Sequence, residues 1–318
     1  MKKVLFTAML VGALAIAQEA PVPSNAPAAQ GAQGAQRARG PANDGVPREN
    51  PSNQVVGVDI DRFIGYPSKA FTKVSHGGLM TRSMLRNGNP YNPGPNGAVL
   101  EYREDCAVAT LEANFETSVF ESPLIHFFYV QSGQGRIDSG PGTQSFNLHA
   151  GSAILAPPNA KQRFVNIGDK QLSMIMLTWK DNDGVTPPKG TLVVDSNTTA
   201  FTANRAHWIH MNKPLFRPTD GINTTISAIY FPPMSYGGPH AHAAGVEEIW
   251  VKVGSDEGYI ILGSEIRKVV GTAAFLSPPN GKTTHSSMNL SEENPSIWLY
   301  ISRRAPQTAQ PAAATSAR

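Results

Sequence analysis

One block of sequence occurs twice in this chain. A glycine, a short apolar run and the tripeptide Pro-Pro-Asn make up GSAILAPPNAKQRF at 151–164, and the same order returns in GTAAFLSPPNGKTTH at 271–285. Pro157 and Pro278 are 121 positions apart, and so are Gly133 and Gly254. An internal repeat of this kind predicts two copies of one structural unit.

Between residues 53 and 304 the chain is divided into short runs of β-branched and aromatic residues. Gly, Pro, Asn and Asp separate the runs, and helical periodicity is hard to find over three turns. This pattern is typical of all-β proteins, in which many short strands form sandwiches or barrels. The clearest runs are LIHFFYV, SAILAP, LSMIMLTW, GTLVVD, TISAIYF, EGYIIL and SIWLYIS.

The two ends of the chain differ in composition from its body. Residues 18–52 and 305–318 are rich in Ala, Pro and Gln and nearly lack large apolar side chains. Such segments bury too little apolar surface to offset the entropy lost on ordering, so we expect a disordered tether and a disordered tail. Between them, the repeat predicts two copies of one β unit, an N-terminal copy at 53–185 and a C-terminal copy at 186–304, with the boundary near DNDGVTPPKG.

The first 17 residues have the form of a secretory signal peptide. Two lysines precede an apolar run from Val4 to Ile16, which ends in a small-residue pattern. A retained N-terminal anchor is the alternative. We expect a periplasmic or secreted protein without a membrane span, because no later stretch reaches the about 20 consecutive apolar residues that a span needs. Cys106 is the only cysteine, which excludes an intramolecular disulfide and a thiolate metal cluster.

The charge balance gives no sign of a nucleic-acid partner. The chain has 27 Lys+Arg and 24 Asp+Glu, and two of the lysines lie in the predicted signal peptide. A nucleic-acid-binding protein needs a clustered basic patch, and none stands out in the sequence. We therefore expect no nucleic-acid partner.

A candidate metal site lies in GPHAHAAGVEEIWVKVG at 238–254. Residues i and i+2 of a strand point to the same face, so His240 and His242 converge without a special backbone. A loop with Gly245 then lets the next strand bring a carboxylate to the same place, and spacing and alternation favour Glu247 over Glu248. His285, after the turn SPPNGKTTH, completes the predicted set.

Three imidazoles and one carboxylate suit one divalent transition metal ion: Fe, Mn, Ni, Cu or Zn. If the metal is six-coordinate, four protein ligands leave two positions open for water, dioxygen or a chelating substrate. Open positions distinguish a reactive metal site from a structural one.

These motifs resemble those of the cupins, whose first motif reads G-x5-H-x-H-x3-4-E-x6-G and second G-x5-P-x-G-x2-H-x3-N. The chain departs from them at the leading glycine, where Ser235 stands nearest, and by extra residues before Pro279 and His285. The resemblance implies two tandem double-stranded β-helix (jelly-roll) barrels and a divalent metal held by three His and one Glu. The matching positions are His240, His242, Glu247 and Gly254, then Gly271, Pro279, Gly281, His285 and Asn289.

The first copy of the repeat lacks the ligand pattern. Counting back 121 positions from the four predicted ligands gives Val119, Glu121, His126 and Phe164. Valine and phenylalanine cannot bind a metal, so we predict a degenerate metal site in the N-terminal barrel. There we expect Glu121 and His126 to share a hydrogen bond.

We expect a metal-dependent oxidoreductase, dioxygenase-like, that acts on a small oxygenated or carboxylate substrate. Because one fold supports many activities, two alternatives stay open: a cupin that binds a small molecule or sugar without turnover, and a cupin lyase or isomerase. No residue is assigned a catalytic acid or base role, and Tyr236, Trp250 and Lys282 are candidates for the pocket rim. Edge strands that pair between copies make a homodimer possible.

Overall fold

The computed structural model describes residues 58–95, 97–139, 144–203 and 211–303. The predicted signal peptide, tether and tail, at 1–17, 18–52 and 305–318, lie outside these residues. In the described part, no helix is both long enough and apolar enough to cross a membrane.

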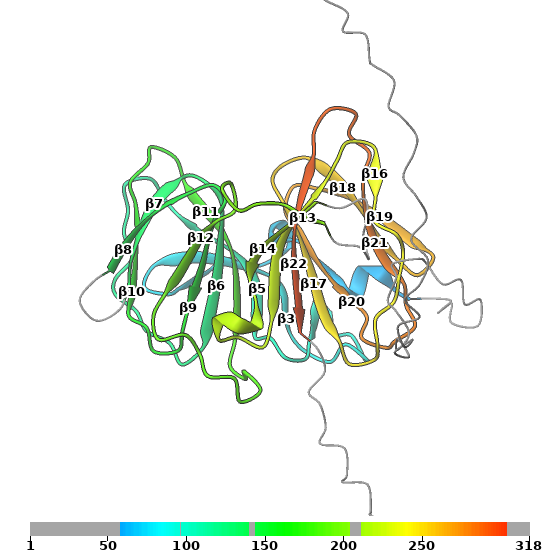
Figure 1. Cartoon of the computed structure of the whole chain (residues 1–318), viewed down its shortest axis with the longest axis horizontal. Helices are drawn as coiled ribbons and strands as arrows, with labels where there is room; N and C mark the ends of the chain where they lie inside the picture. The colour runs from blue at the N-terminus through cyan, green and yellow to red at the C-terminus, as the bar shows by residue number, and fades with distance from the viewer. Residues whose placement is uncertain (1–57, 96, 140–143, 204–210, 304–318) are drawn as a thin grey trace, which may run out of the picture. The chain divides into compact units, whose positions relative to one another are not determined.

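The described chain is nearly all β, as predicted, and forms two barrels (Figure 1). A large and a small sheet form each barrel. In the first barrel the large sheet has the order β12-β9-β6-β11-β5-β3-β2, with β4 beside β3, and the small sheet has the order β10-β7-β8. In the second barrel the orders are β1-β20-β17-β22-β15-β14-β13 and β16-β21-β18-β19.

The strands of the first barrel are β2 (Lys73–Ser75), β3 (Leu79–Asn87), β4 (Ala98–Leu100), β5 (Asp105–Leu111), β6 (Ile125–Ser132), β7 (Gln134–Ser139), β8 (Gln144–His149), β9 (Ser152–Ala156), β10 (Gln162–Asn166), β11 (Leu172–Trp179) and β12 (Leu192–Asp195). Those of the second barrel are β1 (Ile64–Gly65), β13 (Thr202–Ala203), β14 (Met211–Phe216), β15 (Thr225–Phe231), β16 (Ser235–Tyr236), β17 (Glu247–Val253), β18 (Glu257–Leu262), β19 (Glu265–Val270), β20 (Ala273–Ser277), β21 (His285–Asn289) and β22 (Ser296–Arg303). The described residues also form the short 3-10 helices η2 (Ile60–Arg62), η3 (Pro67–Lys69) and η4 (Pro218–Asp220).

All seven apolar runs named from the sequence form strands, namely β6, β9, β11, β12, β15, β18 and β22. The repeat also appears in the pairing of the strands. The order β9-β6-β11-β5-β3 in the first large sheet matches β20-β17-β22-β15-β14 in the second. The repeated sequence therefore specifies the same strand order twice.

The two halves of the chain exchange edge strands. Strand β1, at the start of the described chain, pairs with β20 of the second barrel, Ile64 opposite Phe275. Strand β12, beyond residue 186, pairs with β9 of the first barrel, Leu192 opposite Leu155. The division of the chain into domains at 185/186 stays a prediction. Each large sheet contains one edge strand from the other side of this position.

Strands at the centre of the large sheets, such as β6 and β17, are buried on both faces. In β6, Phe127 and Tyr129 pack in one apolar cluster with residues of the second half, whereas the alternating Phe128 and Val130 belong to a cluster inside the first barrel. The rings of Phe127 and Phe216 lie 6.2 Å apart, centroid to centroid. Every residue of β17 is buried as well. Burial of a large apolar side chain stabilises a fold by about 1.5–3 kcal/mol, so this contact between the halves is a substantial part of the core.

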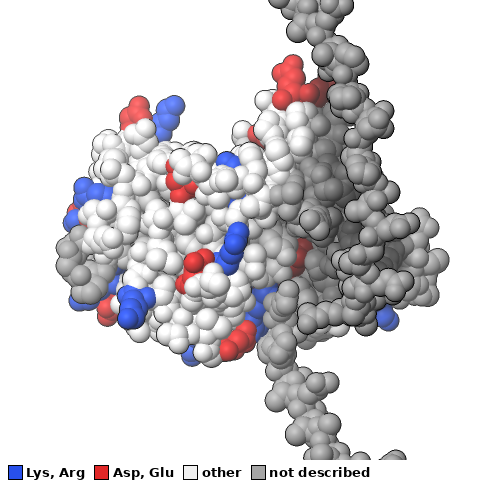
Figure 2. All heavy atoms as spheres, in the orientation of Figure 1, with Lys and Arg blue, Asp and Glu red and all other residues white. Residues whose placement is uncertain are grey.

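On the face shown in Figure 2, acidic and basic side chains are interspersed over a mostly uncharged surface.

Candidate metal centre

A tight turn places His285 beside His240. Strand β20 ends at Ser277 and β21 begins at His285. In the turn between them, the side-chain oxygen of Asn280 accepts hydrogen bonds from the backbone amides of residues 282 and 283, each at 2.9 Å. His240 and His285 then form an isolated antiparallel bridge, with N···O distances of 3.3 and 2.9 Å.

His242 reaches the same point from a loop and not from a strand, contrary to the predicted strand geometry. The loop packs on the turn that precedes His285. Gly245, at φ 82°, donates its N–H to the carbonyl oxygen of Pro279 at 2.8 Å. A Cβ on Gly281 would lie only 3.1 Å from the backbone nitrogen of Ala244, so this close approach favours glycine.

The three imidazoles form one cluster. A ring nitrogen from each of His240, His242 and His285 lies within 4.8 Å of the others. Ring centroids are 4.5 Å apart for His240 and His285, and 4.9 and 5.0 Å apart for His242 with each of the other two. Among the described residues, these three histidines form the one group of three or more His, Cys, Asp or Glu side chains that could hold a metal ion together.

Glu248 supplies the carboxylate of this cluster. Its Oε2 lies 2.6 Å from Nε2 of His242, and its Oε1 lies 2.7 Å from Nε2 of His285. The side chain is completely buried, and the indole N–H of Trp250 donates to Oε1 at 2.6 Å. Burial alone would raise the pKa of Glu248, but the two histidines hold it well below the usual range. Burial lowers the pKa of His242, and Glu248 more than reverses this, so the net shift is upward.

Glu247 points to the opposite side, so the choice of Glu247 over Glu248 is wrong. Its Oε2 accepts hydrogen bonds from the backbone amides of Glu101 and Tyr102, at 2.7 and 3.0 Å. The alternation argument failed because both faces of β17 are covered. By alternation, Ile249 and Val251 share the face of Glu247, and Trp250 and Lys252 share the face of Glu248, and all four are buried.

Two further contacts orient the imidazoles. The Oγ of Ser277 lies 2.9 Å from Nδ1 of His285, and Nδ1 of His240 lies 2.8 Å from the carbonyl oxygen of Gly238. Such contacts at the second ring nitrogen fix the tautomer of metal-binding histidines. Three imidazoles and one buried carboxylate, without sulfur, form a donor set that fits a divalent transition metal ion.

Comparisons with known proteins agree with this fold. A family profile described as the cupin domain matches residues 115–178, in the first barrel. The fold of the described chain is that of two-barrel cupins. No curated protein sequence matches the chain.

Solved structures share this two-barrel fold at low sequence identity. AerE from Microcystis aeruginosa has a TM-score of 0.57 at 13% identity, over 76% of this chain and 99% of its own. Vicilin from Corylus avellana has a TM-score of 0.59 at 12% identity, over 77% and 86%. The Lactobacillus farciminis oxalate decarboxylase formate complex has a TM-score of 0.58 at 9% identity, over 80% and 89%.

The strand register identifies which residues of the first barrel correspond to the four site residues of the second barrel. Phe120 and Gln162 form the bridge that His240 and His285 form in the second barrel. His126 lies opposite Ala156 and Thr178, as Glu248 lies opposite Ser277 and Ser302. Counting by a fixed 121 residues missed this, because the loops of the two copies differ in length. The corresponding residues are Phe120, Ser122, His126 and Gln162 in place of the predicted Val119, Glu121, His126 and Phe164.

His126 contacts a histidine that the sequence did not connect with it. Its Nε2 lies 3.1 Å from Nε2 of His76, which stands at φ 47° in the turn between β2 and β3. Glu121 is exposed, so the expected bond from Glu121 to His126 is wrong. Burial, followed by the nearby His76, lowers the pKa of His126 to about 3. The rings of Phe120 and Phe128 lie against the pair, and Phe164 packs against both of these rings.

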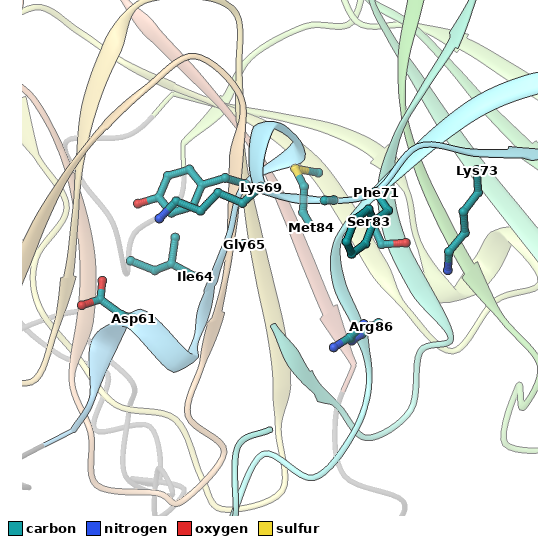
Figure 3. Close-up of a pocket in the computed structure, with 11 residues that line it drawn as sticks. Asp61, Ile64, Gly65, Lys69, Phe71, Lys73, Ser83, Met84 and Arg86 are labelled. Carbon is teal, nitrogen blue, oxygen red and sulfur yellow. The ribbon is translucent and has the colours of Figure 1, made fainter. Parts of the chain in front are cut away.

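The three rim candidates lie in different environments. Tyr236 and Lys282 are exposed, whereas Trp250 is buried against Glu248. A cavity of about 220 Å³ lies elsewhere, where β1 and η3 meet β2 and β3, and none of the four site residues lines it (Figure 3). Its lining includes Tyr66, Phe71 and three basic side chains, Lys69, Lys73 and Arg86.

Proposed function

We propose that this protein is a cupin enzyme that uses one divalent transition metal ion, held by His240, His242, Glu248 and His285 in the second barrel. The observation that carries the proposal is the convergence of three imidazoles on a buried carboxylate that lies within 2.7 Å of two of them. Neutral histidines would leave this carboxylate as an uncompensated buried charge, which is costly. A divalent cation removes that cost and satisfies all four groups.

A metal ion bound here would supply a Lewis acid for anionic or chelating oxygen ligands. With one carboxylate ligand, a divalent centre keeps one net positive charge, which favours a small carboxylate or other oxygenated substrate. The surrounding residues orient the ligands and exclude water. Trp250 holds Glu248, and the rings of Phe231 and Tyr300 lie 6.3 and 5.3 Å from that of Trp250.

Among reactions on such substrates, we propose a dioxygenase-like oxidoreductase. Four protein ligands on a six-coordinate ion leave positions for both dioxygen and a substrate. The second candidate is a lyase, favoured by the shared fold with an oxalate decarboxylase, although a fold likeness does not fix the reaction. The signal-peptide pattern at residues 1–17 supports a periplasmic or secreted location.

The test of the metal site is metal analysis of the full chain purified without chelators. We expect about one divalent ion per chain, and its loss in His240→Ala and in His285→Ala. His149→Ala is the matched control, because His149 is a half-exposed histidine of β8 outside the cluster. Unchanged metal content in the two site variants would contradict the proposal.

The reaction class is tested by turnover with small carboxylates and catechols, with and without oxygen. Oxygen-dependent turnover supports the oxidoreductase. Equal turnover under nitrogen supports the lyase or an isomerase. A saturated metal site without turnover supports a cupin that only binds its ligand.

A further inference from the structure

Adjacent glutamates at the start of β17 point into different parts of the molecule. Glu248 points into the second barrel and contacts His242 and His285. Glu247 points away from it and meets residues 101–103 of the first half of the chain. Glu248, which carries the carboxylate of the proposed metal site, therefore directly follows Glu247, which is bonded to the first half of the chain.

The contacts of Glu247 are close and buried. One carboxylate oxygen accepts both backbone amides, from Glu101 at 2.7 Å and Tyr102 at 3.0 Å. The other oxygen lies 3.9 Å from Nη1 of Arg103. Glu247 is 3% exposed and Arg103 1% exposed, so solvent screens these contacts little.

Arg303 continues this contact from the neighbouring strand. It lies directly opposite Glu247 in the pairing of β17 with β22. Its guanidinium group stacks 3.7 Å above the ring of Tyr102 and binds the carboxylate of Asp183. Arg103 donates in turn to the hydroxyl of Thr224. We call Glu247, Arg103 and Arg303, with the backbone of 101–102, the inter-barrel clamp.

The first barrel has no charged clamp at the equivalent place. There, Ile125 is opposite Trp179 in the pairing of β6 with β11, as Glu247 is opposite Arg303. Both Ile125 and Trp179 are completely buried apolar residues. Among the described residues, the clamp therefore lies beside β17, which carries Glu248. No equivalent charged contact lies beside β6, which carries His126.

We propose that Glu247 is a positioning residue, through which the first barrel sets the distance of Glu248 from His242 and His285. This inference rests on the proposed metal site. Two backbone amides and the Arg103 guanidinium hold the Glu247 carboxylate, and a loss of its charge weakens all three contacts. Because Glu248 is the next residue along the chain, a shift of Glu247 also moves Glu248 relative to the histidines. Metal–ligand distances tolerate about 0.2 Å, so a small displacement of the β17 backbone is enough to weaken binding.

The experiment compares metal binding by the full chain and by Glu247→Gln. Residues that orient metal ligands typically contribute about 10- to 100-fold to metal affinity, and we expect a loss in this range. The dissociation constant is measured for Zn²⁺ and Co²⁺ by competition titration. The d–d absorption bands of bound Co²⁺ report the ligand geometry, and we expect them to shift, which a loss of stability alone would not produce.

Asp138→Asn is the matched control. Asp138 is a buried carboxylate of the first barrel that two arginines bind, Arg136 and Arg163, and it is not part of the clamp. We expect this variant to lose stability but to keep the metal affinity and the Co²⁺ spectrum. If Glu247→Gln fails to fold, Glu247→Asp replaces it, because it keeps the charge and shortens the side chain by one methylene. The same shift is expected for it, to a smaller extent.

Two outcomes separate this inference from the proposed function. If the wild-type chain binds no metal, the metal site itself is wrong and the inference falls with it. If the wild type binds metal and Glu248→Gln does not, whereas Glu247→Gln and Glu247→Asp keep the affinity and spectrum of the wild type, only the positioning role is overturned.

Discussion

Asn166 and Asn289 make the same hydrogen bonds in the two barrels. Each is buried, each donates its side-chain N–H groups to three backbone carbonyls, and each accepts one backbone amide. Each thereby ties the end of a small-sheet strand to the end of a large-sheet strand. The carbonyls belong to Leu111, Glu112 and Lys170 in the first barrel and to Phe231, Pro232 and Asn294 in the second.

We predict that Asn166→Ala and Asn289→Ala each lower the free energy of unfolding by about 1–3 kcal/mol, because buried carbonyls lose their donors. Urea unfolding checks the stability. Asn289→Ala should also weaken metal binding, since β21 carries His285, whereas Asn166→Ala should not. Equal metal affinity in the two variants would contradict the link between this asparagine and the site.

Glu248→Gln should lower metal affinity more than any variant of Glu247. The amide keeps the size of the carboxylate but removes the negative charge that the metal ion would meet, so we expect a loss of more than about 100-fold. Isothermal titration with Zn²⁺ measures it. Glu265→Gln, a change to a half-exposed carboxylate of β19, is the control and should bind as the wild type does.

Ser277→Ala tests the contact that orients His285. Loss of the hydroxyl near Nδ1 should weaken metal binding by about 10-fold. This is the lower end of the range of about 10- to 100-fold that is typical of groups bonded to metal ligands. Ser296→Ala is the matched control, because its buried hydroxyl accepts from the indole of Trp298 and does not contact the cluster. A similar change in metal affinity for both serines would mean that the effect comes from the fold as a whole.

The histidine pair of the first barrel should make stability depend on pH. Burial lowers the pKa of both His76 and His126, that of His126 to about 3, below its usual value of 6.5. The unfolded chain therefore binds protons that the folded chain excludes, and stability falls as the pH drops from about 6.5 toward 3. For His126 the slope approaches about 1.4 kcal/mol per pH unit.

His126→Phe checks this prediction, because phenylalanine fits among Phe120, Phe128 and Phe164. Urea unfolding is measured between about pH 5 and 6.5. Burial raises the pKa of Asp138, but its bonds to arginine and serine outweigh this and lower it to about 2. The stability that Asp138 contributes is lost only below about pH 5, outside the measured range. The variant should show a shallower loss of stability than the wild type. Parallel pH curves would assign the titration to other groups.

The strands were predictable because glycine, proline and asparagine mark where they end. The turn SPPNGKTTH reverses the chain as its composition suggests, and Asn280 closes it. The three histidines could be singled out because two of them are separated by one residue and the third directly follows that turn. The pairing His240–His285 then follows from an ordinary antiparallel bridge.

The carboxylate was not predictable by the same means. Alternation identifies the buried face of a strand only when the other face meets solvent, and β17 meets protein on both. His76 was missed because it comes from a turn about 50 residues before its partner. Apart from His126, the residues of the first barrel predicted to correspond to the site were one or two positions off, because the loops of the two copies differ in length. The register of the paired strands shows this difference, and the sequence repeat alone does not.

The exchange of β1 and β12 has a consequence for how such a protein is dissected or inherited. A gene cut at codon 186 would give a first half that lacks β12 and carries an orphaned β1, and a second half with the reverse defect. Shuffling by recombination at that point would scramble both sheets. The smallest unit that keeps both large sheets complete is accordingly the pair of barrels, even though the repeat in the sequence is half that size.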